Sequence, residues 1–169
     1  MLVESEVSIE FDMLSVAGTH LGPYASALEA LRGGSFAEGE RLLTRCLELA
    51  PIHPGASAHL AMHLAAEGRA EEAISLCKSQ LASLPHHVFL GSIYGWILMC
   101  ASRFEEARAV YQQILAKSED HVDWWINLTL AHIAVGDGAS AERTIAKLED
   151  RVRDMDLIAT LRRAARDAG

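Results

Sequence analysis

A step of 34 residues repeats along this chain and constrains its fold more than any other feature of the sequence. Gly34, Gly68, Ser102 and Gly136 follow one another at this step, and each lies where an apolar helical pattern pauses. A second small-residue series and a larger apolar series share the step: Gly39, Ala73, Ala107 and Ala141, and Leu43, Cys77, Tyr111 and Ile145. Several parallel series at one period predict a stack of equivalent structural units.

Each unit divides into two amphipathic segments, in which apolar residues recur three or four positions apart. In the second unit the segments run from about Gly55 to Glu67 and from about Ala70 to Leu84. Ser35 with Glu38, and likewise Ser102 with Glu105, have the spacing of a capping box, which predicts that a helix begins at each serine. The units are therefore predicted to be helical hairpins.

The period and its residues resemble the tetratricopeptide repeat family, whose motif is W-x2-L-G-x2-Y, then A-x3-F, then P. The matching residues are Trp125, Leu128, Thr129 and His132 in the fourth unit, Tyr94, Gly95 and Leu98 in the third, and Ala107 with Tyr111 in the second part of the motif. The first unit departs from the pattern, with Pro23 and Ser26 where Trp and Leu are usual. The resemblance covers about residues 19–151.

It implies an all-α solenoid with an N-terminal extension over residues 1–18 and about four helix-turn-helix repeats over 19–153. The repeats would span about 20–53, 54–87, 88–121 and 122–153, and residues 154–169 would form a C-terminal capping helix with Ile158 and Leu161 on its apolar face. In the extension, Val3, Val7 and Phe11 belong to an apolar series that alternates with acidic residues. That stretch is either a disordered tail or a ribbon that occupies a groove of its own or a neighbouring chain.

In proteins similar to this family, the first helix of each repeat lines a concave surface that binds a peptide. The resemblance implies that this groove is lined here by Tyr24, Leu28, His59, Met62, Phe89, Ile93, Trp96, Met99, Ile126, Asn127 and Leu130. Such a surface suits an apolar or amphipathic segment. Large apolar residues at helical spacing are commonly core residues, and this alternative stays open for Trp96, Leu128 and Leu130. Family members that grip a C-terminal carboxylate use a cluster of Lys, Arg and Asn, of which only Asn127 is present.

Histidines form the one candidate metal site. His59 and His63 are four residues apart on one predicted helix, so their rings could share a metal ion, but a third ligand is missing. His53, His87 and His121 recur at the 34-residue step before the first helix of a unit, where we expect them to cap helices. No pattern indicates a nucleophilic triad or a phosphate-binding loop, and no cofactor is expected.

Charge narrows the range of partners. With 15 Lys and Arg against 23 Asp and Glu, the formal net charge is −8, which disfavours nucleic acid and anionic membrane surfaces. The three cysteines fit reduced thiols, and the sequence shows neither a signal peptide nor a spanning stretch, so we expect a cytoplasmic protein.

The sequence thus predicts a non-catalytic protein-interaction module, an adaptor or chaperone-like protein that binds a partner peptide. It also has a weaker similarity to the small tetratricopeptide chaperones of bacterial type III secretion, although those usually carry three repeats. The alternative is a self-associating scaffold or structural subunit, for example a homodimer, formed through Trp124, the N-terminal ribbon or the oppositely charged ends of the chain. A third reading is a metal-dependent enzyme around His59 and His63.

Overall fold

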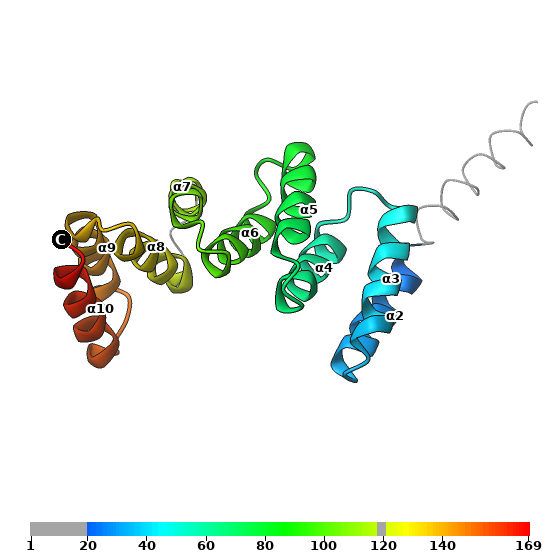
Figure 1. Ribbon diagram of the computed structural model, residues 1–169, viewed down its shortest axis with the longest axis horizontal. Helices are drawn as coiled ribbons and strands as arrows, with labels where there is room; N and C mark the ends of the chain where they lie inside the picture. Colours follow the sequence, from blue (N-terminus) through cyan, green and yellow to red (C-terminus); the bar gives the residue numbers. More distant parts are fainter. Residues whose placement is uncertain (1–19, 118–120) are drawn as a thin grey trace, which may run out of the picture.

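The computed structural model describes residues 20–117 and 121–169 (Figure 1). Within these ranges the chain forms nine α-helices and no strand, which confirms the predicted all-α class. The helices are α2 (Leu21–Arg32), α3 (Phe36–Leu49), α4 (Pro54–Ala66), α5 (Ala70–Ser83), α6 (Val88–Cys100), α7 (Phe104–Leu115), α8 (Val122–Ala134), α9 (Gly138–Glu149) and α10 (Met155–Asp167). The N-terminal extension lies outside the described residues. No described helix is long and apolar enough to cross a membrane.

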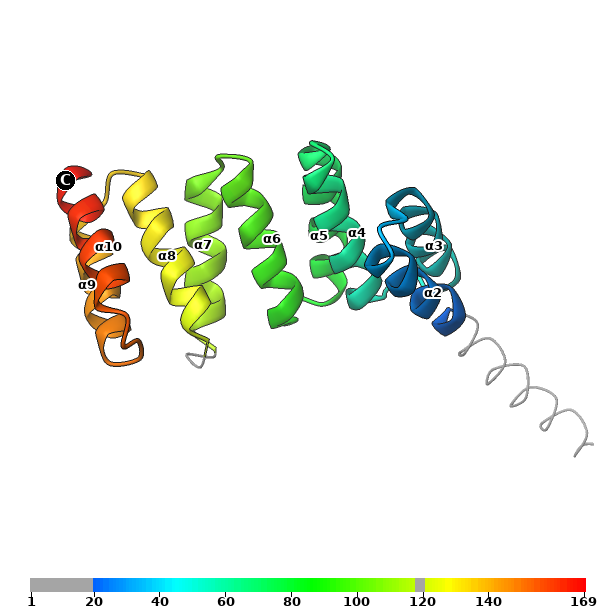
Figure 2. The same ribbon diagram turned by 90° about the horizontal axis from the view of Figure 1, so that it is seen from below.

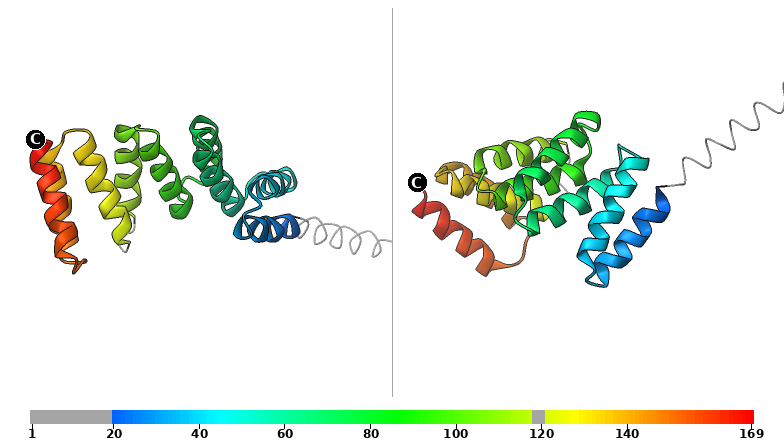
Figure 3. Two further views of the ribbon diagram at one scale, coloured as in Figure 1. Left: turned by 60° about the horizontal axis from the view of Figure 1, so that its bottom comes forward. Right: turned by 45° about the vertical axis from the view of Figure 1, so that its right-hand side comes forward.

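Consecutive helices pair as four hairpins, α2–α3, α4–α5, α6–α7 and α8–α9, and α10 packs against α9 and α8. The hairpins follow one another in chain order along the molecule (Figure 2). Each is rotated relative to its neighbour, so the stack twists along its length (Figure 3). The first helices α4 and α6 also pack against each other, whereas α6 and α8 approach each other closely at few positions and the backbones of α2 and α4 at fewer still.

The turn inside each hairpin has one left-handed residue. Gly34, Gly68 and Gly136 have φ angles of 77°, 78° and 80°, and Ser102 takes the same conformation with φ 58°. The next backbone N–H then donates to a carbonyl five residues back, as Arg103 does to Leu98 at 2.8 Å. This is the hydrogen bond that closes a helix in a Schellman motif.

The predicted capping boxes are wrong. Ser35 is the N-cap of α3, but its side chain makes no capping hydrogen bond. Ser102 lies one residue before the actual N-cap of α7, Arg103. The acidic partners bind arginines instead, Glu38 binding Arg41 at 2.6 Å and Glu105 binding Arg108. Ser102 takes the left-handed conformation that closes the preceding helix, so the N-cap of α7 falls on the next residue, Arg103.

Small residues allow the paired helices to approach closely. Ala73, Ala107 and Ala141 are fully buried, as the series predicts. The ring of Tyr111 lies against Gly95, where an added Cβ would come within 2.8 Å of it.

The three cysteines differ in exposure. Cys46 and Cys77 are buried in second helices, and burial raises the pKa of the Cys77 thiol to about 12. Cys100, at the end of α6, is exposed.

Ion pairs join successive hairpins along one edge. Arg69, which begins α5, binds Glu72 in its own helix and Glu40 of the preceding hairpin, at 2.8 and 2.6 Å. Its counterpart Arg103, 34 residues later, lies 3.3 Å from Glu71 of α5. The repeated step thus places equivalent arginines at equivalent junctions, although their acidic partners, Glu40 and Glu71, are not at equivalent positions.

Helix α10 covers the C-terminal end of the stack. Ile158, Leu161 and Ala165 are buried on its inner side, and Arg162 binds Glu149 of α9 at 2.7 Å. Its apolar face and position agree with the predicted capping helix, although Met155 is exposed.

Candidate protein-binding surface

The first helices of the hairpins expose a row of apolar side chains. Met62 in α4, Trp96 in α6 and Leu130 in α8 occupy the same position of three successive repeats, and 38%, 39% and 39% of their surfaces are exposed. The alternative that Trp96 and Leu130 are core residues is therefore wrong for both. Leu128, for which the same alternative was open, is buried. We call Met62, Trp96 and Leu130 the apolar row.

The other predicted lining residues are also accessible. Phe89, in the first turn of α6, is 51% exposed. The half-buried members of the set are Tyr24, Leu28, His59, Ile93, Met99, Ile126 and Asn127. None of the predicted residues is fully buried, although Tyr24, Ile93, Met99 and Ile126 also pack against the core.

The composition of the helices explains this surface. The opposite side of α6 is buried through Leu90, Ile97 and Leu98, so the helix carries apolar residues on both sides. The sequences of α4, α6 and α8 contain no lysine or arginine. A helix that is apolar all round is buried on all sides or covered by something else. Exposed apolar surface of this kind makes the face a candidate interaction site.

Tyr24 connects the first two hairpins. Its ring centroid lies 4.7 Å from that of His53 and 6.1 Å from that of His59, and its hydroxyl lies against Gly55. Burial at this junction raises the pKa of Tyr24 and lowers the pKa of His59. The Tyr24 side chain thus bridges α2 and α4, whose backbones approach each other closely at few positions.

His59 and His63 make contacts with different residues. The Nε2 atom of His63 lies 3.2 Å from Oε2 of Glu40, whose other oxygen binds Arg69. Hydrogen bonding from Arg69, above all, lowers the pKa of Glu40. His59 instead faces Tyr24. In the described part of the chain, no three His, Cys, Asp or Glu side chains are grouped closely enough to hold a metal ion.

Two of the three periodic histidines cap helices, as predicted. Nδ1 of His53 accepts from the Ala56 N–H at 3.0 Å, and Nδ1 of His87 accepts from the Leu90 N–H at 3.2 Å. His121 makes no side-chain cap, and its ring packs against Trp124 with centroids 4.1 Å apart. Trp124 is half-buried and packs against the core.

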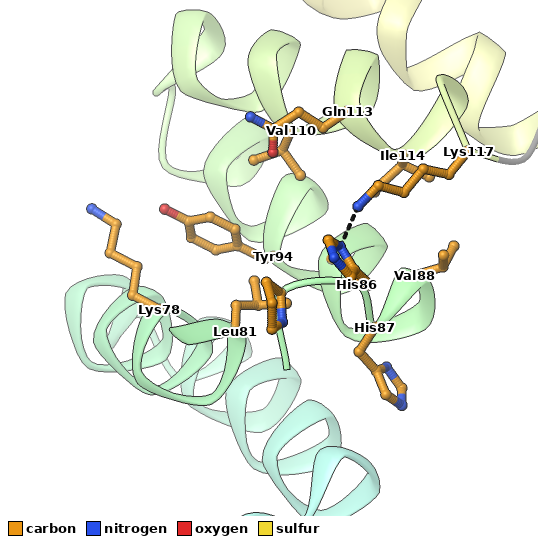
Figure 4. A pocket seen from close by; sticks show the side chains of 12 residues that line it. Lys78, Leu81, His86, His87, Val88, Tyr94, Val110, Gln113, Ile114 and Lys117 are labelled. Atoms are coloured by element: carbon orange, nitrogen blue, oxygen red, sulfur yellow. Dashed lines mark hydrogen bonds between the residues drawn. The ribbon is translucent and has the colours of Figure 1, made fainter. Parts of the chain in front are cut away.

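Sequence reasoning missed a cavity of about 290 Å³ between α5, α6 and α7 (Figure 4). It lies on the side of α6 away from the apolar row. Gly91, which lines the cavity, stands in the third repeat where the fourth has Trp125, but repeat position alone does not show whether the space beside it is filled.

Stacked helical hairpins with an exposed apolar face define a helical-repeat protein-interaction module. Family models described as "Tetratricopeptide repeat" match residues 24–86 and residues 98–165. The chain belongs to the tetratricopeptide repeat family, a family whose members are in general non-catalytic modules for protein interaction. No curated protein matches the sequence.

Solved structures share the fold at low sequence identity. A tetratricopeptide repeat protein from Parabacteroides merdae has a TM-score of 0.76 and 17% identity over 89% of this chain, which spans 59% of that protein. Pseudomonas aeruginosa pilF has a TM-score of 0.74 and 21% identity, with 91% of this chain and 75% of that chain covered. The first tetratricopeptide domain of Spaghetti (RPAP3), bound to the HSP90 peptide SRMEEVD, has a TM-score of 0.64 and 17% identity, with 68% and 91% covered.

Proposed function

We propose that this protein is a non-catalytic adaptor or chaperone-like module that binds an apolar or amphipathic segment of a partner protein across the apolar row. The observation that carries this proposal is the exposure of Met62, Trp96 and Leu130 at one position of three stacked repeats. Methionine and tryptophan supply large and adaptable contact area, and tryptophan is enriched among the residues that dominate binding energy.

Charge argues for apolar rather than acidic partners on this face. The solved RPAP3 domain is bound to SRMEEVD, a peptide with an acidic end. In this chain α4, α6 and α8 offer no lysine or arginine to such a peptide. An acidic C-terminal tail would therefore lose its hydration without gaining ion pairs. An amphipathic helix or an extended apolar segment avoids this cost.

The decisive experiment compares variants that place the same charge on different exposed apolar residues. The full-length wild type, a Met62→Glu, Leu130→Glu variant and a matched Ile52→Glu, Met155→Glu variant are used to capture partners from native extract. Ile52 and Met155 are exposed apolar residues outside the row, so the second variant controls for charge and solubility. Circular dichroism verifies that all three proteins are folded.

We expect a captured partner to be retained by the Ile52→Glu, Met155→Glu variant and lost from the row variant. Its purified binding segment should lose at least about thirtyfold in affinity for the row variant, as expected when central contact residues are replaced. Equal capture by all three proteins would refute binding at the row. Light scattering tests the alternative of self-association. If the mass of the wild type rose with concentration and that of the row variant did not, the apolar row would instead be a self-association surface.

A further inference from the structure

The third repeat lacks a tryptophan that the fourth repeat has. Trp125 is buried, and its ring lies beneath Nζ of Lys147 at 4.6 Å and Cζ of Arg151 at 5.4 Å. The residues 34 positions earlier are Gly91, Gln113 and Lys117. The third repeat thus keeps one cation, Lys117, at the corresponding position but has no tryptophan ring beside it.

The cavity lies beside Gly91, at the repeat position of the Trp125 indole. Its apolar walls are Leu81 from α5, Val88 and Tyr94 from α6, and Val110 and Ile114 from α7 (Figure 4). The fourth repeat also has a cavity between its helices, of about 420 Å³, but there Trp125 is part of the wall. The counterparts of Val88 and Lys117 do not line it. Beside Gly91, the cavity of the third repeat thus extends to Val88 and Lys117, an end that the cavity beside Trp125 does not reach.

Two lysines lie at the opposite ends of the cavity. In Figure 4, Lys78 and Lys117 flank the apolar side chains from either side. Lys117 contacts Nδ1 of His86, and no carboxylate among the described residues lies within ion-pair distance of it. Lys78 lies 3.7 Å from Glu106 in a largely exposed pair, which is a weak interaction. Both ammonium groups can bind an incoming carboxylate.

We propose that this cavity is a second docking site, which binds one aromatic side chain of a partner polypeptide with a carboxylate on each side of it. The proposal rests on protein binding as the function of the chain but places this contact on the opposite face of α6 from the apolar row. The aromatic ring takes the place that Trp125 fills in the fourth repeat, and the carboxylates bind Lys78 and Lys117. The aromatic ring supplies buried apolar area, and the charges orient the segment.

The separation of the lysines favours a polypeptide over a free aromatic acid. A small acid has one carboxylate next to its ring and reaches one end of the cavity. A segment with acidic residues on both sides of the aromatic residue reaches both ends at once. The apolar walls between the lysines match a single aromatic side chain, because they replace the environment of one indole.

The probe is an acetylated and amidated peptide, Glu-Glu-Trp-Glu-Glu, titrated into the ¹⁵N-labelled full-length protein and followed by amide NMR shifts. We expect shifts in α5, α6 and α7 around the cavity. A peptide with Ala in place of Trp, and one with Lys in place of the four Glu residues, should both bind at least about tenfold more weakly, because each lacks one of the two kinds of contact. Binding of the acidic aromatic peptide should weaken as salt rises.

Substitution at Gly91 tests the cavity directly. Gly91→Trp supplies the missing indole within the chain, so the peptide should lose at least about thirtyfold in affinity. Gly91→Ala is the matched control, because it adds a methyl group without filling the space and should bind as the wild type does. Lys117→Glu should weaken binding roughly fivefold, the effect of losing an exposed ion pair. If Gly91→Trp does not fold, Val110→Phe narrows the cavity from α7.

Several outcomes would overturn the proposal. They are absent shifts, shifts confined to the apolar row, and undiminished binding to a folded Gly91→Trp or Val110→Phe variant. A change in the mass of the unliganded protein on Gly91→Trp would identify a second copy as the occupant and would also overturn it. Failure here leaves partner capture by the apolar row untouched, since Met62 and Leu130 are on the other face.

Discussion

Gly91 and Gly95 are one helical turn apart in α6, but their surroundings differ. A Cβ on Gly95 would lie 2.8 Å from the ring of Tyr111, which is fully buried and cannot move away. A Cβ on Gly91 would lie 3.3 Å from Cδ1 of Ile114, the end of a flexible side chain beside a cavity. In a helix, alanine is favoured over glycine by about 1 kcal/mol when nothing else changes.

We therefore expect opposite changes in the free energy of unfolding. Gly95→Ala should destabilise the protein by about 1–3 kcal/mol through overpacking. Gly91→Ala should be neutral or stabilise it by up to about 1 kcal/mol. Urea unfolding followed by circular dichroism measures both, and equal effects of the two substitutions would contradict the described packing.

His132 is a polar residue at an apolar position of the repeat. It is buried, its Nδ1 has no hydrogen-bond partner, and that atom lies 3.6 Å from Oδ2 of Asp137. The equivalent residues of the preceding repeats are Leu64 and Leu98, both buried. We expect His132→Leu to stabilise the fold by about 1 kcal/mol, because it removes an unsatisfied buried polar group. A loss of stability in urea unfolding would show that the interaction of His132 with Asp137 stabilises the fold by more than burial of the imidazole destabilises it.

The same substitution should change the pH dependence of stability. Burial lowers the pKa of His132 from its ordinary value of 6.5, and burial also lowers those of His53 and His59. The folded chain then binds these protons more weakly than the unfolded chain does, so this stabilisation is complete above pH 6.5 and is lost as the pH falls below it. The urea midpoint should fall between pH 7.5 and 5.5, and it should fall less in His132→Leu.

At the scale of the helices, the turn at Ser102 differs from its counterparts. It holds a serine at φ 58°, where the other three hairpins have glycine at φ 77–80°. The left-handed region costs a residue with a Cβ about 1 kcal/mol relative to glycine. Ser102→Gly should therefore raise the free energy of unfolding by up to about 1 kcal/mol, and Gly68→Ser should lower it by a similar amount. Thermal or urea unfolding of the pair is the check.

The sequence predicted the helices well because two patterns, the apolar spacing within each segment and the 34-residue step between segments, agree on them. In the second unit, apolar spacing predicted segments within one residue of α4 and α5. The helix starts were predicted less well, since serine and glutamate in the right spacing cannot show that the backbone has already closed the turn at Ser102. The fold class followed from the 34-residue step together with the residues that resemble the tetratricopeptide repeat motif.

The candidate site was predictable only in part. Repeat position placed Met62 and Trp96 on one face, but it could not tell an exposed Trp96 from a buried one, since both fit the same helical spacing. Repeat position also could not show that a cavity lies beside Gly91. Periodicity records which residues face inward, and it does not record whether the space between them is filled.

At the scale of the whole molecule, the stack has its weakest junction at the N-terminal hairpin. Helix α2 makes little contact with α4, whereas α4 packs firmly against α6. Because each repeat is stabilised by its neighbours only, hairpins at a weak junction open most easily. We expect amides in α2 and α3 to exchange hydrogen faster than those in α6 to α9, as measured by mass spectrometry.

Glu40 provides the test of that junction. It lies in α3 and binds Arg69 and His63 of the second hairpin. Glu40→Ala should increase exchange in α2 and α3 and leave α6 to α9 unchanged. Glu71→Ala removes the corresponding pair with Arg103 at the next junction, so it should not increase exchange in the first hairpin. Equal exchange throughout the wild type would show one cooperative unit instead.

The three cysteines differ in exposure, so the rates at which their thiols react can report how often different hairpins open. A maleimide or disulfide reagent should modify Cys100 at once, whereas Cys46 in α3 and Cys77 in α5 can react only while their hairpins are open. The order in which the two buried thiols are alkylated then reports which hairpin opens more often. Cys46 should react before Cys77, and a partner that clamps the first two hairpins together should slow both without protecting Cys100.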